Sequence, residues 1–212
     1  MSNLTDFFPS GGGGGLTPKF QEFNASGTFT PTQALIDAGG YIEVFLVAGG
    51  GGGGVQDGIP GGFGGEVKIK KMNLTSTTGC SVIIGSGGSA NAPYGINGGN
   101  SVFSGASAGG VDITCNGGKG GGSNAFAVNA NPSLSPNWPA KPANAGATAG
   151  NGVFGYGAGG AANADSQTQS YGGMGTGSSN STYANSGHGG ISAASIYYTK
   201  GGSGYCLIKW YE

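Results

Sequence analysis

The side chains that carry most enzyme chemistry are scarce in this sequence and lie far apart. His188 is the only histidine and stands between two glycines. A metal site or a Ser-His-Asp triad needs partner residues close to the histidine, and we identify none along the chain. The nine acidic residues are dispersed without an obvious pair for acid–base chemistry. We therefore expect no enzymatic activity, no metal and no cofactor, and we expect His188 to lie at the surface.

Two glycine-rich stretches match nucleotide-binding patterns in letter only. Residues 155–160 fit G-x-G-x-x-G, but that pattern requires a strand before it and a helix after it. Residues 117–120 resemble a phosphate loop but lack a Ser or Thr after Lys119. With 51 glycines in 212 residues, such matches arise by chance. We reject both patterns as functional sites.

The charged residues and the apolar stretches argue against two classes of partner, nucleic acids and membranes. All eight basic residues are lysines, and the net charge is −1. Because nucleic-acid binders depend on basic clusters and on Arg contacts to bases, we expect no nucleic-acid partner. Lys68 and Lys70 alternate with Val67 and Ile69, which is typical of the solvent face of a strand. No apolar stretch approaches the roughly 20 residues of a membrane helix, so we expect no membrane insertion.

The three cysteines are interpreted as structural residues. Cys80, Cys115 and Cys206 each lie in or beside an apolar segment, and no two form a C-x-x-C pair. A buried cysteine behaves as a small apolar residue. We predict three buried thiols, with a disulfide between two of them as the open alternative.

Short apolar segments between the glycine runs predict an all-β fold. Residues 41–48 form the strongest strand, apolar on both faces except at Glu43, which favours a central position covered on both sides. In residues 205–211, Cys206, Ile208 and Trp210 share one face of the predicted strand. The other elements that we expect are strands at 66–70, 80–84 and 111–115, a strand–turn–strand unit over 21–31 with Gly27 at the turn, and a short helix over 32–38 capped by Thr30 or Thr32. Together they predict a small antiparallel β-sandwich of the jelly-roll type.

The connections between these strands are far longer than the usual loop of about 4–6 residues. They span residues 49–65, 85–110 and 117–204, and Gly-Gly doublets recur through all three. Glycine segments can lie backbone against backbone as extended helices of about three residues per turn, joined by weak Cα–H···O contacts. We predict that the connections pack as such polyglycine II-type helices; the alternative is floppy loops.

The first 19 residues differ from the rest. They contain an apolar cluster, Leu4, Phe7, Phe8 and Pro9, followed by Ser10 and five glycines. This is the pattern of an adhesive peptide on a flexible linker, although a frayed terminus would also fit. We expect residues 1–19 to attach the protein to a larger assembly and residues 20–212 to form the glycine-rich β domain.

Aromatic residues in the longest connection are candidates for recognition. They are set among Gly, Ser, Asn and Ala, the composition of antibody-like recognition loops. The candidates for receptor contact are Trp138, Tyr156, Tyr171, Tyr183 and His188. The alternative is that these aromatic rings cover and pack the glycine segments.

Several motifs in order resemble the glycine-rich domain of bacteriophage tail fibres and related virion appendages. An apolar strand runs directly into polyglycine over residues 41–51, and the resemblance covers about residues 20–212. The remaining motifs that carry it are residues 23–30, 61–67, 82–88, 98–103 and the closing segment 201–210. The stretch 126–142 departs from the pattern because it is poor in Gly-Gly.

The resemblance implies a structural or adhesive role on a virion, commonly in several copies. We therefore expect a phage surface protein, assembled in the host cytoplasm, that docks on other virion proteins through its N-terminal peptide and binds a host glycan or protein. A homo-oligomer such as a trimer is expected. One alternative is a capsid decoration protein with the same anchor, and a more distant one is an extracellular glycine-rich matrix or ice-binding protein.

Overall fold

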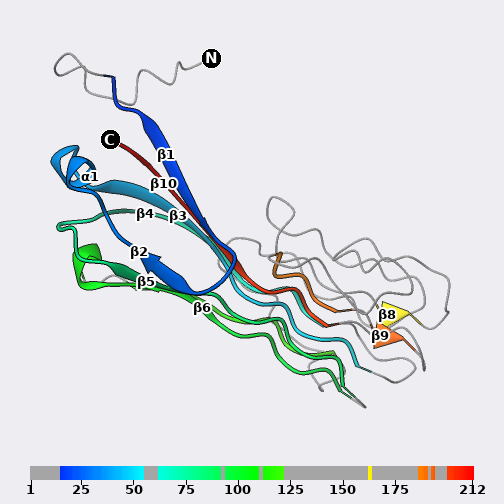
Figure 1. Cartoon of the computed structure of the whole chain (residues 1–212). Coiled ribbons are helices and arrows are strands. Elements are labelled where there is room, and N and C mark those ends of the chain that lie inside the picture. Colours follow the sequence, from blue (N-terminus) through cyan, green and yellow to red (C-terminus); the bar gives the residue numbers. More distant parts are fainter. Residues whose placement is uncertain are drawn as a thin grey trace.

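The computed structural model describes residues 15–54, 62–91, 94–109, 112–121, 162–163, 186–190, 192–193 and 200–212. Two antiparallel sheets face each other at one end of the molecule (Figure 1). The first sheet has the order β1 (Pro18–Phe23), β10 (Tyr205–Tyr211), β3 (Tyr41–Val47) and β4 (Val67–Asn73). The second has the order β2 (Gly27–Phe29), β5 (Cys80–Ile83), β6 (Ser101–Ser104) and β7 (Ile113–Cys115). The all-β sandwich is confirmed; the jelly-roll assignment stays a prediction.

Smaller elements complete the described chain. The helix α1 (Gln33–Asp37) begins at Thr32, whose side-chain oxygen accepts a hydrogen bond from the Leu35 N–H at 3.1 Å. It is followed by Gly39 and Gly40, both at positive φ, where glycine carries no steric penalty. The others are a 3-10 turn at Ala106–Ala108 and a short parallel pair, β8 (Ala162–Asn163) and β9 (Ser192–Ala193).

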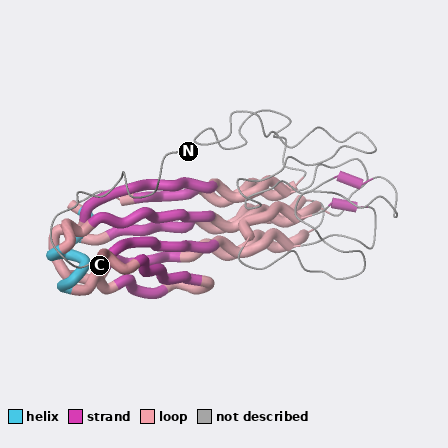
Figure 2. Tube along the Cα trace, turned by 90° about the horizontal axis from the view of Figure 1, so that it is seen from above, coloured by secondary structure: helices cyan, strands magenta, loops and turns pink. Residues whose placement is uncertain are grey.

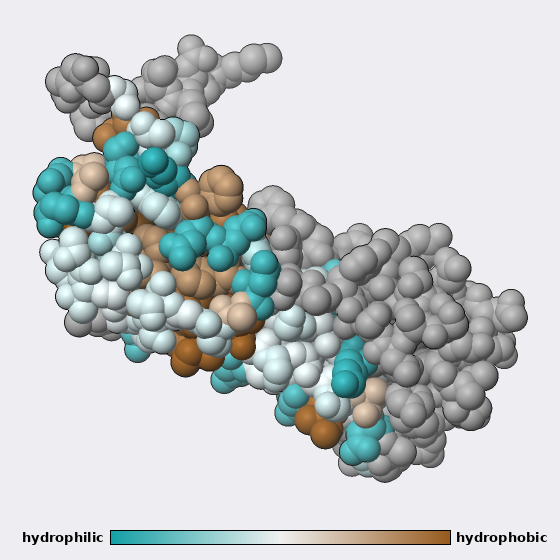
Figure 3. Space-filling model, in the orientation of Figure 1, coloured by the Kyte–Doolittle hydropathy of each residue, from teal (hydrophilic) through white to brown (hydrophobic). Residues whose placement is uncertain are grey.

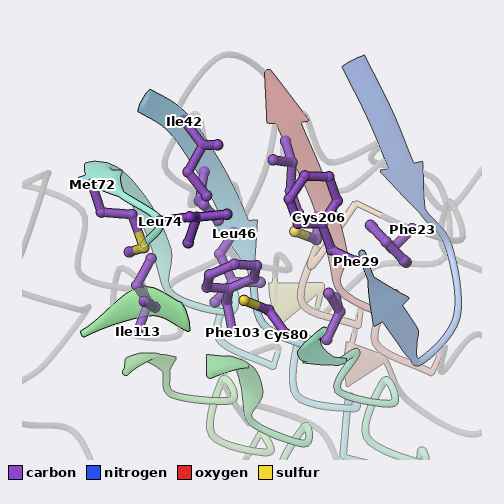
Figure 4. Close-up of a cluster of buried hydrophobic side chains, with 14 of the residues drawn as sticks. Phe23, Phe29, Ile42, Leu46, Met72, Leu74, Cys80, Phe103, Ile113 and Cys206 are labelled. Atoms are coloured by element: carbon purple, nitrogen blue, oxygen red, sulfur yellow. The ribbon is translucent and has the colours of Figure 1, made fainter. Parts of the chain in front are cut away.

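Apolar side chains from both sheets fill the space between them (Figure 4). The rings of Phe29 and Trp210 meet edge to face with their centroids 5.2 Å apart. Cys206 and Ile208 point inward together with Trp210, as the alternation along β10 predicts. The buried cluster consists of Phe23, Phe29, Leu35, Ile42, Val44, Leu46, Ala48, Met72, Leu74, Cys80, Val82, Phe103, Ala108, Ile113, Cys115, Cys206 and Ile208.

The three cysteines are buried free thiols, as predicted. Burial raises the pKa of the Cys115 and Cys206 thiols to about 12. The Cys115 thiol donates to the Leu46 carbonyl oxygen at 3.3 Å. These side chains are therefore core packing rather than reactive groups.

The structure corrects three details of the sequence analysis. Gly27 lies in β2 rather than at the turn between β1 and β2, and these two strands belong to different sheets. Strand β6 lies inside the expected connection 85–110. The sequence did not predict it, because four residues are too few to give a clear strand pattern. The first sheet begins at Pro18, before the expected domain boundary, because Pro18 pairs with Tyr211.

The lysines of β4 are also placed differently from the expectation. Lys68 pairs with Leu46, whose side chain is in the core, so Lys68 lies on the face of β4 that looks toward the second sheet. Its ammonium group reaches across the edge and donates to the Thr114 carbonyl oxygen at 2.6 Å. Ile69, the apolar residue that follows Lys68, lies on the outer face and is 38% exposed. A lysine stem long enough to pass around a sheet edge explains the reversal.

Candidate functional site

The glycine-rich segments leave the sandwich as direct continuations of its strands. Strand β3 runs on into residues 48–54, β5 into 85–91 and β7 into 116–121, while 62–66 lead back into β4. Figure 2 shows these segments lying side by side beyond the strands. Residues 94–100 lead back into β6 in the same way, and 200–204 into β10.

Segment 48–54 lies at the centre, and its N–H groups point in turn to three neighbours. From Gly49 onward, the first N–H donates to segment 94–100, the second to 200–204 and the third to 62–66, and the fourth returns to 94–100. This repeat of three is the geometry of an extended helix with about three residues per turn. The bonds join Gly49 to Gly99 (3.0 Å), Gly50 to Gly202 (2.9 Å), Gly51 to Phe63 (2.8 Å) and Gly52 to Ile96 (2.9 Å).

The carbonyl groups of the same segment accept from three other neighbours. These are segments 116–121, 85–91 and 186–190, again in a repeat of three. All three run parallel to segment 48–54, whereas the three that receive its N–H groups run antiparallel to it. The acceptor bonds run from Gly118 to Gly49, Gly88 to Gly50, Gly190 to Gly51, Gly121 to Gly52 and Asn91 to Gly53. The buried backbone of the central segment is thus hydrogen-bonded in six directions.

The six neighbours also form a closed ring around the centre. Each adjacent pair in the ring is antiparallel and joined by backbone hydrogen bonds. Their order is 62–66, 186–190, 200–204, 85–91, 94–100 and 116–121, which returns to 62–66. We call these seven segments the glycine array. The prediction of glycine segments packed backbone against backbone is confirmed for the described residues.

Glycine is required in the array because neighbouring main chains touch at the Cα atoms. A Cβ added at any of sixteen array glycines would stand 1.8–2.2 Å from a backbone carbonyl oxygen. Those positions are 49, 50, 51, 52, 62, 65, 85, 87, 88, 95, 98, 117, 118, 120, 201 and 204. Real Cβ atoms never approach an oxygen so closely, so even alanine would force the segments apart.

Polar side chains close the outer seam between segments 94–100 and 116–121. Asn100 accepts through Oδ1 from the Gly117 N–H, and Asn97 accepts through Oδ1 from the Gly120 N–H, both at 2.9 Å. The two asparagines are three residues apart, so they share one side of the segment. The sequence analysis missed them; asparagines three apart among glycines were the available signal.

A buried carboxylate joins the array to the sandwich. Glu66 accepts from both the backbone N–H and the side-chain amide of Asn116, at 2.8 and 2.9 Å. Its other oxygen lies 3.0 Å from the Lys68 ammonium. On another side of the junction, the Ser101 hydroxyl donates to the Val47 carbonyl and accepts from the Gly85 N–H. These contacts hold the first turn of the array in register with the strands.

The far end of the array carries a few exposed side chains among the described residues. Tyr94 and Ile96 are about half exposed, and Lys119 is exposed on the neighbouring segment. Rings, an aliphatic side chain and a cation at the edge of a polar surface can contact a sugar or a protein, but they do not form a catalytic set. No group of three or more His, Cys, Asp or Glu in the described ranges could hold a metal ion.

His188 is placed inside the molecule, which corrects the expectation of a surface histidine. Its side chain is 9% exposed, and its backbone belongs to the array through a bond from the Gly202 N–H to its carbonyl. Burial lowers the pKa of the imidazole below its ordinary value. The glycines on both sides of His188 belong with it to an array segment. Such a buried ring offers little contact area to a receptor.

The other candidate residues lie outside the described part of the chain. These are the receptor-contact candidates Trp138, Tyr156, Tyr171 and Tyr183 and the anchor residues Leu4, Phe7, Phe8 and Pro9. Among the helices in the described ranges, none has the length and apolar character needed to cross a bilayer.

The fold and the array define a β-sandwich that is extended by a glycine-built bundle. The family model described as "Glycine-rich domain" matches residues 24–211. The chain therefore belongs to this family. No curated protein matches it significantly.

Proposed function

We propose that this chain is a non-enzymatic bacteriophage virion protein that attaches the particle to its host surface. The observation that carries the proposal is the glycine array, a rod with few charged side chains whose main chains are locked to one another at the Cα atoms. Such a rod places Gly121, where the longest connection begins, at the end remote from the sandwich.

The sequence inserted between array segments is suited to binding. Residues 122–185 follow Gly121 at the far end of the array and lead to Ser186, which lies at the sandwich end, because the next residue, Gly187, contacts Val47 and Ala48. Within this stretch are Trp138, Tyr156, Tyr171 and Tyr183, surrounded by Gly, Ser and Asn. Aromatic side chains on a preorganised scaffold supply contact area at low entropic cost. The proposed ligand is a surface polysaccharide or protein of the host.

The opposite end of the molecule is suited to assembly. Strand β1 begins at Pro18 on the sandwich, so the preceding residues are tethered there rather than at the array tip. The apolar residues Leu4, Phe7, Phe8 and Pro9 would dock on another virion protein, with several copies per particle. The resemblance to glycine-rich tail-fibre domains supports this arrangement; a capsid decoration protein would use the same anchor at another place.

The proposal is tested by competition and by localisation. Purified protein added to host cells should reduce phage adsorption, and Trp138→Ala together with Tyr171→Ala should remove this effect. The matched control is Ile83→Ala, an exposed side chain on the sandwich, which should compete as well as the parent protein. Gold-labelled antibody on particles should mark the tail; labelling of the head without any competition would favour capsid decoration instead.

A further inference from the structure

The two sheets of the sandwich present unlike outer faces. The outer face of the second sheet carries mainly small hydroxyl side chains, namely Thr28, Ser81, Ser104 and Thr114, together with Val102 and Ile83. The outer face of the first sheet carries large apolar and aromatic side chains, namely Phe20, Tyr41, Phe45, Ile69, Tyr205, Leu207 and Tyr211, together with four charged residues, Glu22, Glu43, Lys71 and Lys209. Serine and threonine suit a sheet face turned to water, whereas rings and aliphatic chains suit a covered face.

The most exposed of these side chains, together with Leu16 just before β1, gather at the end of the first sheet remote from the array. Leu16, Phe20 and Tyr41 are 46%, 69% and 67% exposed. Tyr211 lies between Phe20 and Tyr41, because its strand, β10, lies between β1 and β3. It pairs with Pro18 of β1, and its neighbour Trp210 pairs with Ile42 of β3. We call Leu16, Phe20, Tyr41 and Tyr211 the aromatic patch.

Charged residues border the aromatic patch. Lys209 pairs with Phe20 across the strands, and Glu43 lies 3.7 Å from Lys71 in an ion pair. Figure 3 shows hydrophobic surface between hydrophilic areas on this part of the sandwich. Single exposed apolar residues need no explanation, but a cluster with a charged rim marks an interaction surface.

We propose that the aromatic patch is a second contact of the virion anchor and docks on the same virion protein that holds the N-terminal peptide. The inference rests on the proposed function and adds a surface to it. The chain leaves the described structure at Gly15, next to Leu16 of the patch. Phe8 is seven residues earlier, so a protein that binds Phe8 lies within about 25 Å of Gly15. The partner should present an apolar surface with few charges opposite Phe20 and Tyr41.

Because the peptide and the aromatic patch bind as two linked contacts, neither contact needs a high affinity of its own. Once the peptide is bound, the patch meets its partner at an effective concentration in the millimolar range, set by the short glycine linker. Aromatic side chains at the centre of an interface carry most of its binding energy. Phe20→Ser combined with Tyr41→Ser should therefore lower the number of copies per particle about tenfold or more. Ile83 is also an exposed apolar residue but lies on the second sheet, so Ile83→Ser should leave the copy number unchanged.

Photocrosslinking in assembled particles identifies the occupant. A benzophenone amino acid placed at position 20 or 41 should crosslink to the same virion polypeptide as one at position 7, and one at position 83 should not. A crosslink from position 20 to another copy of this chain, or none at all while the protein is present in particles, would overturn the proposal. At positions 7, 20 and 41 this assay replaces one aromatic side chain with another, so it decides even if the serine variants misfold. Absence of the protein from purified particles, by immunoblot, would overturn the virion function itself.

Discussion

Gly50 and the carbonyl group of His188 are in direct contact across the array: a Cβ at residue 50 would stand 1.9 Å from the His188 oxygen. Neither side can yield, because Gly50 donates to Gly202 and the His188 carbonyl accepts from the same residue. The contact shows why the chain tolerates the entropic cost of so much glycine. At the sixteen close-contact positions of the array, a neighbouring main chain occupies the place of the missing Cβ.

Gly50→Ala should therefore destabilise the fold by about 3 kcal/mol or more, because overpacked backbone cannot relax as a side chain does. Urea unfolding measures the loss. Gly15→Ala is the control, since nothing lies within 4 Å of a Cβ there, and it should be nearly neutral. Equal stabilities for the two variants would mean that the array does not form.

The asparagines of the array should differ in their response to a charge. Asn97→Asp keeps the oxygen that accepts from Gly120 and should change stability by less than about 0.5 kcal/mol. Asn116→Asp replaces an amide donor 2.9 Å from Glu66 with a second carboxylate, and should cost about 2 kcal/mol or more at neutral pH. The penalty should shrink on acidification, as one of the two carboxyl groups takes up a proton. Denaturant melts at pH 7 and pH 4 would show it.

The buried thiols predict alkaline sensitivity. Burial raises the pKa of Cys115 and Cys206 from the ordinary value of 9.0 to about 12, so the unfolded chain releases these protons first. Stability should be complete below about pH 9 and decline between pH 9 and 12. Cys206→Ala should lessen this decline, while costing stability through the cavity that it leaves.

Thiol labelling gives an independent check of the same burial. At pH 8 about one buried thiol in ten thousand is ionised when its pKa is about 12. A thiol reagent should therefore modify Cys115 and Cys206 only after denaturant is added. Fast labelling of the native protein would contradict the placement of these side chains.

His188 predicts a loss of stability in mild acid. Burial lowers the pKa of this imidazole in the folded state, so the unfolded chain binds the proton more readily. The contribution is present above the ordinary pKa of 6.5 and is lost as the pH falls below it. His188→Gln should flatten the dependence of stability on pH between about 7 and 5. Because the chain has a single histidine, its proton resonance reports the titration without ambiguity.

Local patterns determined much of the sandwich in advance. The alternation in residues 205–211 correctly turned Cys206, Ile208 and Trp210 inward, because successive side chains of a strand point to opposite faces. The helix begins at Thr32, one of the two predicted caps, because capping depends on a few adjacent backbone groups. Glycine content and low charge also predicted close-packed main chains, with floppy loops as the alternative.

The tertiary structure decided what local patterns do not contain. A glycine segment has no side-chain pattern from which its neighbouring segment could be predicted. The hydrogen-bond partner of each N–H in the array therefore depends on where the strands place the ends of the segments. His188 is buried because its segment joins that array. Lys68 turns inward because its ammonium group binds the Thr114 carbonyl and the Glu66 carboxylate at the sheet edge. Sequence determined that main chains must touch; only the assembled fold decided which ones, because glycine contacts depend on position and not on side-chain chemistry.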